Sequence, residues 1–318
     1  IQGFYGSYPG SEYTQMTALV SGSSGYLGYN LTAKLVGRGE PVIAVVRPTS
    51  KTAHLADLGE NVRIYIDDGS ADGLASAFEG NDISVVYHLA ACRPEYLGQE
   101  DTIETVDANI GFGTRLLHAA VRVGCPSFIN TGSWWQFEET GAIAPNSLYA
   151  ATKQAFQDIL SFYVQTSGIR AVSLIPYDIY GPNDWRGRLT SVLLRAAKGE
   201  LIKMTPGEQK MDIIHVSDVT EAYISACKLM DQRHIDGNGE HYFLGSGHRR
   251  SLKEIANIFE QAWESPLAIN WGELPYRENQ VFMPCPASPT LPTWRPQMSL
   301  DDGFKDLIQN DRLGKTAQ

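Results

Sequence analysis

The feature that most constrains the fold is a glycine-rich turn between a short apolar run and a helical pattern near the start of the chain. Thr17 to Val20 has the pattern of a buried strand, residues 21–28 read Ser-Gly-Ser-Ser-Gly-Tyr-Leu-Gly, and Asn30 to Val36 has the pattern of a helix. Glycines let such a turn bend tightly and let a pyrophosphate approach the backbone at the N-terminus of the helix, where negative charge is favourable. Strand, glycine turn and helix in this order predict a dinucleotide-binding site.

The same alternation of strand and helix patterns continues along the first half of the chain. Further strands are predicted at Pro41 to Val46, Val62 to Ile66, Ile83 to Leu89, Ser127 to Thr131 and Ala171 to Ile175. Helical runs separate several of them, including Thr105 to Val123, and this order favours an α/β fold with a doubly wound parallel sheet. Ligands of such sheets bind at the carboxyl ends of the strands. The residues expected to meet there are Gly22, Arg47, Asp68, Ala90 and Ser133.

The alternation weakens beyond residue 182. We therefore predict a Rossmann domain over residues 16–182 and a smaller α/β substrate lobe over residues 183–318, interleaved with the core. Residues 1–15 have no periodicity and are expected to be a tag or a disordered leader.

Three elements are expected after this boundary. Met211 to Val216 should form a strand, and a helix from Val219 to Met230 should follow it, capped by Ser217 and Asp218. Ser251 begins a capping box that opens another helix. The proline-rich residues 284–296 should be extended.

Composition narrows the class of protein. The chain is 43% hydrophobic and 19% charged, as in ordinary globular proteins, and its formal charge of -10 argues against nucleic-acid binding. It has no apolar stretch of about 20 residues that could span a membrane. The four cysteines show no metal-ligand spacing, so we expect reduced thiols in a cytoplasmic protein and no metal site.

Tyr149 and Lys153 form a Tyr-x-x-x-Lys motif within a helical pattern. Four residues make about one helical turn, so the two side chains share a face. A free phenol has a pKa near 10, and a nearby ammonium favours the phenolate and brings that pKa closer to neutrality. The pair is therefore a candidate proton donor and acceptor for a carbonyl/alcohol couple.

Arg47 follows the second predicted strand, and Ser50 and Lys51 follow Arg47. Sites that prefer NAD usually carry an Asp or Glu at this place, which binds the ribose hydroxyls. A guanidinium instead suits the 2′-phosphate of NADP. The sequence therefore predicts NADPH or NADP as the cofactor.

Several motifs occur together in a fixed order over most of the chain. They are residues 21–28, Tyr-His-Leu-Ala-Ala at 87–91, Asn109, Ser133, the Tyr149 and Lys153 pair, Tyr-Gly-Pro at 180–182 and Asp-Ile-Ile-His-Val-Ser-Asp at 212–218. With these motifs the chain resembles the extended short-chain dehydrogenase/reductase family of sugar-nucleotide epimerases, dehydratases and reductases. Residues 130–136 and 148–158 look like those of the CDP-abequose synthase type of reductase, which reduces a 4-keto-deoxysugar carried on a nucleotide.

The resemblance assigns roles to individual residues. Tyr149 would be the general acid or base, Lys153 would lower its pKa and bind the nicotinamide ribose, and Ser133 would hydrogen-bond the substrate carbonyl. One of Asp67 and Asp68 would contact the adenine. The cofactor-binding residues would be Gly22, Ser24, Gly25, Tyr26, Leu27, Gly28, Arg47, Asp67, Asp68, Leu89, Ala90, Ala91, Asn109, Tyr149, Lys153 and Pro176. The substrate residues would be Trp134, Trp135, Gln136, Asp178, Arg188 and Arg295.

Two departures from the family pattern affect the diphosphate of the substrate. Asp178 takes the place of a common Asn, and Met211 takes the place of a common Arg. Arg188, Lys203 and Arg295 are candidates for the missing positive charge. Relatives often form homodimers through the helices that carry Asn109 and Tyr149, so the resemblance makes a homodimer one candidate form of this protein.

The leading hypothesis is NADPH-dependent reduction of the 4-keto group of a nucleotide-linked deoxysugar, with Tyr149 as the proton donor. The alternatives are a nucleotide-sugar epimerase that retains NAD, a reductase of a non-sugar ketone, and a catalytically silent NADPH-binding sensor.

Overall fold

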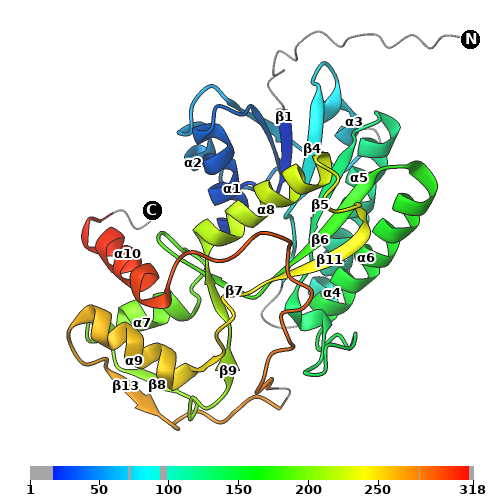
Figure 1. Ribbon diagram of the computed structural model, residues 1–318. Coiled ribbons are helices and arrows are strands. Elements are labelled where there is room, and N and C mark those ends of the chain that lie inside the picture. The colour runs from blue at the N-terminus through cyan, green and yellow to red at the C-terminus, as the bar shows by residue number, and fades with distance from the viewer. Residues whose placement is uncertain (1–16, 71–72, 94–98, 279, 315–318) are drawn as a thin grey trace, which may run out of the picture.

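A parallel sheet of seven strands forms the centre of the molecule. The computed structural model describes residues 17–70, 73–93, 99–278 and 280–314, so the predicted leader lies outside the described residues. The strands are β1 (Thr17–Ser21), β2 (Val42–Val46), β3 (Val62–Ile66), β4 (Ile83–His88), β5 (Ser127–Thr131), β6 (Arg170–Pro176) and β11 (Asn238–Leu244). Their order is β11-β6-β5-β4-β1-β2-β3 (Figure 1). The chain changes direction between β1 and β4, which confirms the doubly wound sheet and makes this crevice the expected ligand site.

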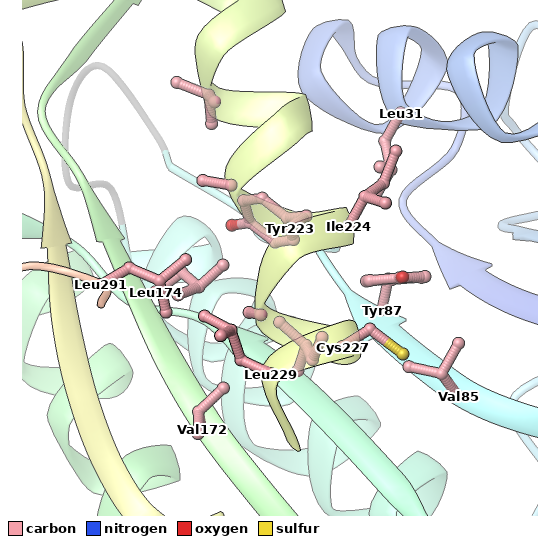
Figure 2. Packing of buried hydrophobic residues seen from close by; sticks show 14 of the residues in the cluster. Leu31, Val85, Tyr87, Val172, Leu174, Tyr223, Ile224, Cys227, Leu229 and Leu291 are labelled. Carbon is pink, nitrogen blue, oxygen red and sulfur yellow. The ribbon is translucent and has the colours of Figure 1, made fainter. Parts of the chain in front are cut away.

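Helices cover both faces of the sheet because successive strand residues point to opposite sides. On one face Ala18 and Val20 pack with α1 (Tyr26–Gly37) and α8 (Val216–Asp231). Figure 2 shows Tyr223 and Ile224 of α8 in this cluster, with Leu31 of α1 and Tyr87 of β4.

The opposite face of the sheet is equally apolar. There Leu19 packs with residues of three helices. The three helices are α3 (Gly73–Phe78), α5 (Phe112–Arg122) and α6 (Leu148–Ser167). The short helix α2 (Ala53–Ala56) instead packs its Leu55 with Ala44 and Val46 on the α1 side of β2.

The helical run predicted from Thr105 starts earlier and is irregular. It comprises α4 (Gln99–Val106), the π-helical turn η1 (Asp107–Gly111) and α5. Asn109 lies in the π-helical turn and is buried. Its amide accepts a hydrogen bond from the Cys92 N–H (2.7 Å) and donates to the Cys92 carbonyl and to Thr152 Oγ1 (both 2.9 Å). Asn109 thus ties the loop after β4 to helix α6.

The smaller lobe is built around three helices whose apolar faces meet at Leu193, Phe259 and Phe304 (Figure 1). These helices are α7 (Leu189–Ala197), α9 (Leu252–Trp263) and α10 (Leu300–Arg312). Short strand pairs surround them: β7 (Asp178–Tyr180) with β10 (Ile213–His215), β8 (Ile202–Met204) with β13 (Ile269–Trp271), and β9 (Lys210–Met211) with β12 (Arg250–Ser251). After β6 the chain enters the smaller lobe. It returns to the main sheet for helix α8, which packs on the sheet, and for strand β11, and it then enters the smaller lobe again.

Two local predictions in this lobe were wrong. Helix α8 begins at Val216, and its N-cap is His215, whose Nδ1 accepts a hydrogen bond from the Ser217 N–H at 3.3 Å. The Asp218 carboxylate, predicted to cap α8, instead accepts hydrogen bonds from backbone N–H groups of residues 297 and 298. The predicted strand Met211 to Val216 is split at Asp212 into β9 and β10.

Other local predictions are confirmed in whole or in part. Ser251 Oγ accepts a hydrogen bond from the Glu254 N–H (3.1 Å), and Glu254 accepts one from the Ser251 N–H (2.6 Å), as in a capping box. The expectation of an extended segment is met only in part, because residues 284–296 contain no helix but turn at residues 292 and 293, where Thr293 has φ +60°. Among the described helices, none is long and apolar enough to cross a membrane.

Candidate active site

Two glycines in the turn after β1 lie too close to neighbouring backbone atoms for a side chain to replace their hydrogens. Gly22 has φ +75°, and a Cβ on it would lie 2.6 Å from the Ala90 nitrogen. A Cβ on Gly28 would lie 2.1 Å from the Gly22 carbonyl oxygen. Helix α1 starts here behind Gly25, without a side-chain cap and without an acidic residue in its fully described first turn. Its N-terminal amides therefore form a favourable site for a phosphate.

A cavity of about 1150 Å³ opens above this turn at the carboxyl edge of the sheet. The predicted cofactor residues that line it are Gly22, Ser24, Gly25, Arg47, Asp67, Leu89, Ala90 and Ala91. Its volume and its glycine floor suit a dinucleotide. We call it the cofactor cavity.

The far end of the cofactor cavity carries two ion pairs. Arg47 Nη1 lies 3.4 Å from Glu104 Oε1, and both side chains are exposed. Asp67 lines the cavity and pairs with Arg115 at 3.3 Å. Asp68 accepts a hydrogen bond from the Ser70 N–H and is not among the described residues that line the cavity. Of the two aspartates, Asp67 is therefore the one that lines the cofactor cavity.

A second cavity of about 370 Å³ adjoins the first, and both are lined by Leu89 and Ala91. We call it the substrate cavity. The predicted residues that line it are Leu27, Ser133, Trp134, Trp135, Tyr149, Pro176, Asp178 and Arg188, together with Leu89 and Ala91. Catalytic and substrate candidates from β5, α6 and β7 therefore meet at one place.

Tyr149 and Lys153 are held differently within helix α6. Burial raises the pKa of Tyr149, while Arg93, a hydrogen bond with the Ser133 side chain, and further arginines lower it. The Lys153 ammonium is buried, donates to the Thr131 carbonyl at 2.9 Å and has its pKa lowered to about 8 by that burial. The net effect is a raised pKa for Tyr149, so the lowering expected from Lys153 is not seen, whereas Lys153 can lose its proton closer to neutrality than a solvated lysine can.

Gln136 positions Ser133 from behind the cavity wall. Its Oε1 accepts a hydrogen bond from the Ser133 N–H (2.7 Å), and its Nε2 donates to Gln154 and Gln157 of α6. Ser133 Oγ accepts from the Trp135 N–H (3.3 Å), which completes a capping box at the short helix η2 (Trp134–Gln136). The Ser-x-x-Gln spacing was a sequence signal for this arrangement. Gln136 is fully buried and is not among the described lining residues.

Several other predicted site residues do not line either cavity in the described part of the structure. Tyr26 is buried and donates a hydrogen bond to the Pro182 carbonyl, and Arg295 donates to the Trp294 carbonyl. The predicted residues that are not among the described lining residues of either cavity are Tyr26, Gly28, Asp68, Asn109, Gln136, Lys153 and Arg295. His88 is fully buried, and this burial lowers its pKa to about 3.

Two arginines in the substrate cavity escaped the sequence reasoning. Arg93 lies over the ring of Trp135, with its Cζ 4.2 Å from the ring centroid. Arg186 binds both carboxylate oxygens of Asp184, at 2.7 and 2.8 Å. Neither belongs to a recognisable motif, because each reaches the cavity only through the tertiary fold. Asp178 lies among these cations, and burial still raises its pKa to about 6.

A third cavity of about 300 Å³ shares Tyr180, Met211 and Ile213 with the substrate cavity. Arg250 also lines it and stands opposite Met211 in the β9 and β12 pair. A guanidinium therefore lies across the strand pair from Met211, the position where many relatives carry one.

Comparisons with known proteins agree with this geometry. Residues 18–245 match the model of the NAD dependent epimerase/dehydratase family. The CDP-abequose synthase of Yersinia pseudotuberculosis is 25% identical over 85% of this chain and 92% of its own length. The UDP-N-acetyl-alpha-D-glucosaminuronate decarboxylase of Bacillus cytotoxicus is 26% identical over 92% of this chain and 96% of its own length.

A solved structure shows the same fold. The UDP-glucose 4-epimerase of Thermotoga maritima, determined with UDP-glucose, has a TM-score of 0.83 at 21% identity, over 94% of this chain and 100% of that chain. The family match, the glycine turn and the joined cavities lead to one conclusion: this chain belongs to the NAD dependent epimerase/dehydratase family.

Proposed function

We propose that this protein is an NADPH-dependent reductase of the 4-keto group of a nucleotide-linked deoxysugar. The observation that carries the proposal is the substrate cavity, in which Ser133 is hydrogen-bonded to Tyr149 beside a group of arginines. The similarity to the CDP-abequose synthases supports the choice of reaction.

The residues of the substrate cavity have complementary tasks in this reaction. Bound NADPH supplies a hydride to the carbonyl carbon. Ser133 holds the carbonyl oxygen by a hydrogen bond, and Tyr149 donates a proton to that oxygen, so the products are an alcohol and the oxidised cofactor. While it is protonated, Lys153 adds positive charge one turn from Tyr149 on the same helix.

Arg47 is the basis for proposing NADPH. It lines the cofactor cavity at the end of β2, where NAD-preferring sites usually carry an acid. Ser50 lines the cavity beside it and accepts a hydrogen bond from the Arg47 N–H at 3.1 Å. A guanidinium and a hydroxyl at this place suit a 2′-phosphate.

The arginines also support a nucleotide diphosphate as the carrier of the sugar. Arg186 and Arg188 line the substrate cavity, and Arg250 lines the adjoining third cavity. Guanidinium groups bind phosphate oxygens through paired hydrogen bonds. Trp134 and Trp135 form the wall next to Ser133 and would limit the size of the sugar. We further propose that the enzyme works in the cytoplasm as a homodimer.

The proposal is tested by following NADPH oxidation with 4-keto-6-deoxy and 4-keto-3,6-dideoxy sugars on CDP, dTDP, GDP and UDP, with NADH in parallel. Rapid oxidation with one nucleotide series and a preference for NADPH would support it. Isomer formation without net oxidation, or NAD retained through purification, would favour an epimerase. Turnover of non-sugar ketones alone would replace the substrate class.

The matched control is Tyr149→Phe, which removes the proton donor and keeps the ring. We expect turnover to fall by about a thousandfold or more, because the alkoxide loses its acid. NADPH binding, measured by fluorescence, should stay close to that of the wild type. Loss of both would assign Tyr149 a structural role.

A further inference from the structure

Arg93 occupies an unusual position at the substrate cavity. It follows β4 and lines the cavity together with Ser133, Trp135 and Tyr149. Its guanidinium lies over the Trp135 ring, 4.2 Å from the centroid. Among the described residues, none forms a hydrogen bond or ion pair with the Arg93 side chain. The indole face is thus its main described support, and such stacking favours a fixed cation.

The backbone that carries Arg93 is held in place by helix α6. The preceding residue, Cys92, exchanges two hydrogen bonds with the buried Asn109 amide (2.7 and 2.9 Å), and that amide also donates to Thr152. Thr152 lies on the same helix as Tyr149. The backbone next to Arg93 and the Tyr149 side chain are therefore both anchored to helix α6.

Trp135 is fixed from the other side of the same site. The backbone N–H of Trp135 donates a hydrogen bond to Ser133 Oγ. The Gln136 side chain accepts a hydrogen bond from the Ser133 backbone N–H and donates one to α6. The Trp135 ring under the Arg93 guanidinium thus belongs to the short helix η2. The Ser133 hydroxyl that hydrogen-bonds Tyr149 belongs to the N-cap residue of the same helix. Although Arg93 itself is exposed, the ring beneath its guanidinium and the hydroxyl beside Tyr149 are thus held by neighbouring residues.

Three other polar groups near the Tyr149 phenol already have hydrogen-bond or ion-pair partners. Arg186 is paired with Asp184, the Lys153 ammonium donates to the Thr131 carbonyl, and the Tyr223 hydroxyl bonds Thr131 Oγ1. The titratable and charged groups that face Tyr149 are Arg93, Arg186, Arg188, Asp178, Lys153 and Tyr223. Of these cations, Arg93 acts most strongly on the phenol.

We propose that Arg93 is a positioning residue for proton transfer, because its guanidinium, held over Trp135, supplies a permanent positive charge that faces Tyr149 from the substrate side. A guanidinium stays protonated over the working range of pH, whereas a buried lysine does not. Tyr149 becomes a phenolate when it gives up its proton. The negative charge of this phenolate is then balanced by two cations, Lys153 on the same helix and Arg93 on the substrate side. This inference holds for any carbonyl substrate and does not depend on the sugar or its carrier.

The test measures the ionisation of Tyr149 directly and needs no substrate. Protein labelled at the tyrosine Cζ is titrated by NMR with NADP bound, since the ligand stabilises the fold in alkaline solution. The Tyr149 signal is identified by its absence in Tyr149→Phe. In Arg93→Gln we expect the Tyr149 pKa to rise by roughly one unit relative to wild type. Arg93→Lys keeps the charge and should restore most of the difference.

Two further variants separate charge from structure. Arg195→Gln removes the same charge from an exposed pair with Glu200 and should leave the Tyr149 pKa unchanged. Trp135→Leu removes the platform and should raise this pKa by a smaller amount than Arg93→Gln. An Arg93→Gln titration that matches the wild type would overturn the proposal, and so would an Arg93→Lys titration that matches Arg93→Gln. Circular dichroism confirms that each variant is folded over the range used.

Discussion

At the scale of single residues, the pair of Arg47 and Glu104 makes cofactor preference testable. Their side chains are 3.4 Å apart and both line the cofactor cavity. A 2′-phosphate would compete with the Glu104 carboxylate for the Arg47 guanidinium. We expect Arg47→Ser to weaken NADPH binding by about tenfold, which corresponds to about 1.4 kcal/mol, and to leave NADH binding nearly unchanged.

The opposite change is expected at Glu104. Glu104→Gln removes a like charge from the phosphate site and should tighten NADPH binding by roughly threefold. Lys51→Ser is the matched control, because Lys51 is exposed in the same loop and is not among the described lining residues. Fluorescence titrations with both cofactors give the answer. A change in Lys51→Ser equal to that in Arg47→Ser would show that loop charge alone sets the preference.

Asp178 should give the protein a distinctive dependence of stability on pH. Burial raises its pKa from the ordinary 3.8 to about 6, so between these values the folded state binds more protons than the unfolded chain. Stability due to this group therefore falls as the pH rises from about 4 to about 6. Asp178→Asn lacks this loss and should be more stable than wild type by about 2 kcal/mol at pH 7, with no advantage near pH 4. Thermal unfolding of both proteins at several pH values checks this, and parallel curves would contradict it.

The sequence predicted the positions of the candidate catalytic residues better than those of their surroundings. Ser133 closely follows strand β5, and Tyr149 and Lys153 lie one helical turn apart, so local spacing was enough to select them as candidates. Arg93 has no local pattern, because its importance comes from Trp135, which lies far away in the sequence. Gln136 was predicted to wall the sugar pocket, and the structure instead places it behind Ser133.

At the scale of elements, the π-helical turn between α4 and α5 links the loop after β4 to the catalytic helix. Replacing Asn109 by Ala would leave the partly buried Cys92 backbone groups and Thr152 without this partner. We expect Asn109→Ala to destabilise the protein by about 2 to 4 kcal/mol. It should also weaken NADPH binding, because Cys92 lines the cofactor cavity.

Asn310→Ala provides the control for this prediction. The Asn310 amide hydrogen-bonds only Asp306 of its own helix α10 among the described contacts. Its loss should cost well under half as much stability and leave NADPH binding intact. Equal effects of the two variants, measured by chemical unfolding and by NADPH titration, would remove the special role of the π-helical turn.

The elements that the sequence predicted well are those with local boundaries. The predicted ranges of β3 and β5 match the structure, because each is a short run of mainly β-branched and aromatic residues followed by a turn that contains glycine. The start of α4 was missed because Gln99 to Val106 is largely polar and has no clear apolar period. The strand around Asp212 is split because its carboxylate accepts hydrogen bonds from the N–H groups of Ser246 and Gly247, which are distant in sequence.

At the scale of the whole molecule, the outer face of α6 is the place to test self-association. Phe162 on this helix keeps 60% of its surface exposed. A second copy of the chain that packs against α6 would cover it, as in the proposed homodimer. We expect Phe162→Glu to convert a dimer into a monomer at micromolar concentration, because the interface would bury an unpaired charge.

Sedimentation velocity measures this change. Leu201→Glu is the control, since Leu201 is 61% exposed but lies in the smaller lobe. Dissociation by Leu201→Glu with an intact Phe162→Glu dimer would move the interface to that lobe. A wild-type monomer would end the dimer proposal.

The path of the chain through the main sheet also determines when this protein can finish folding. Strand β6 ends at Pro176, but its outer neighbour β11 begins only at Asn238, after α7 and α8 have been made (Figure 1). While the ribosome synthesises the residues between them, β6 is an unpaired edge strand that can recruit other chains. The main sheet therefore cannot be completed before this intervening segment has been made, and a nascent chain that stalls in this interval is the form most exposed to aggregation and most in need of a chaperone.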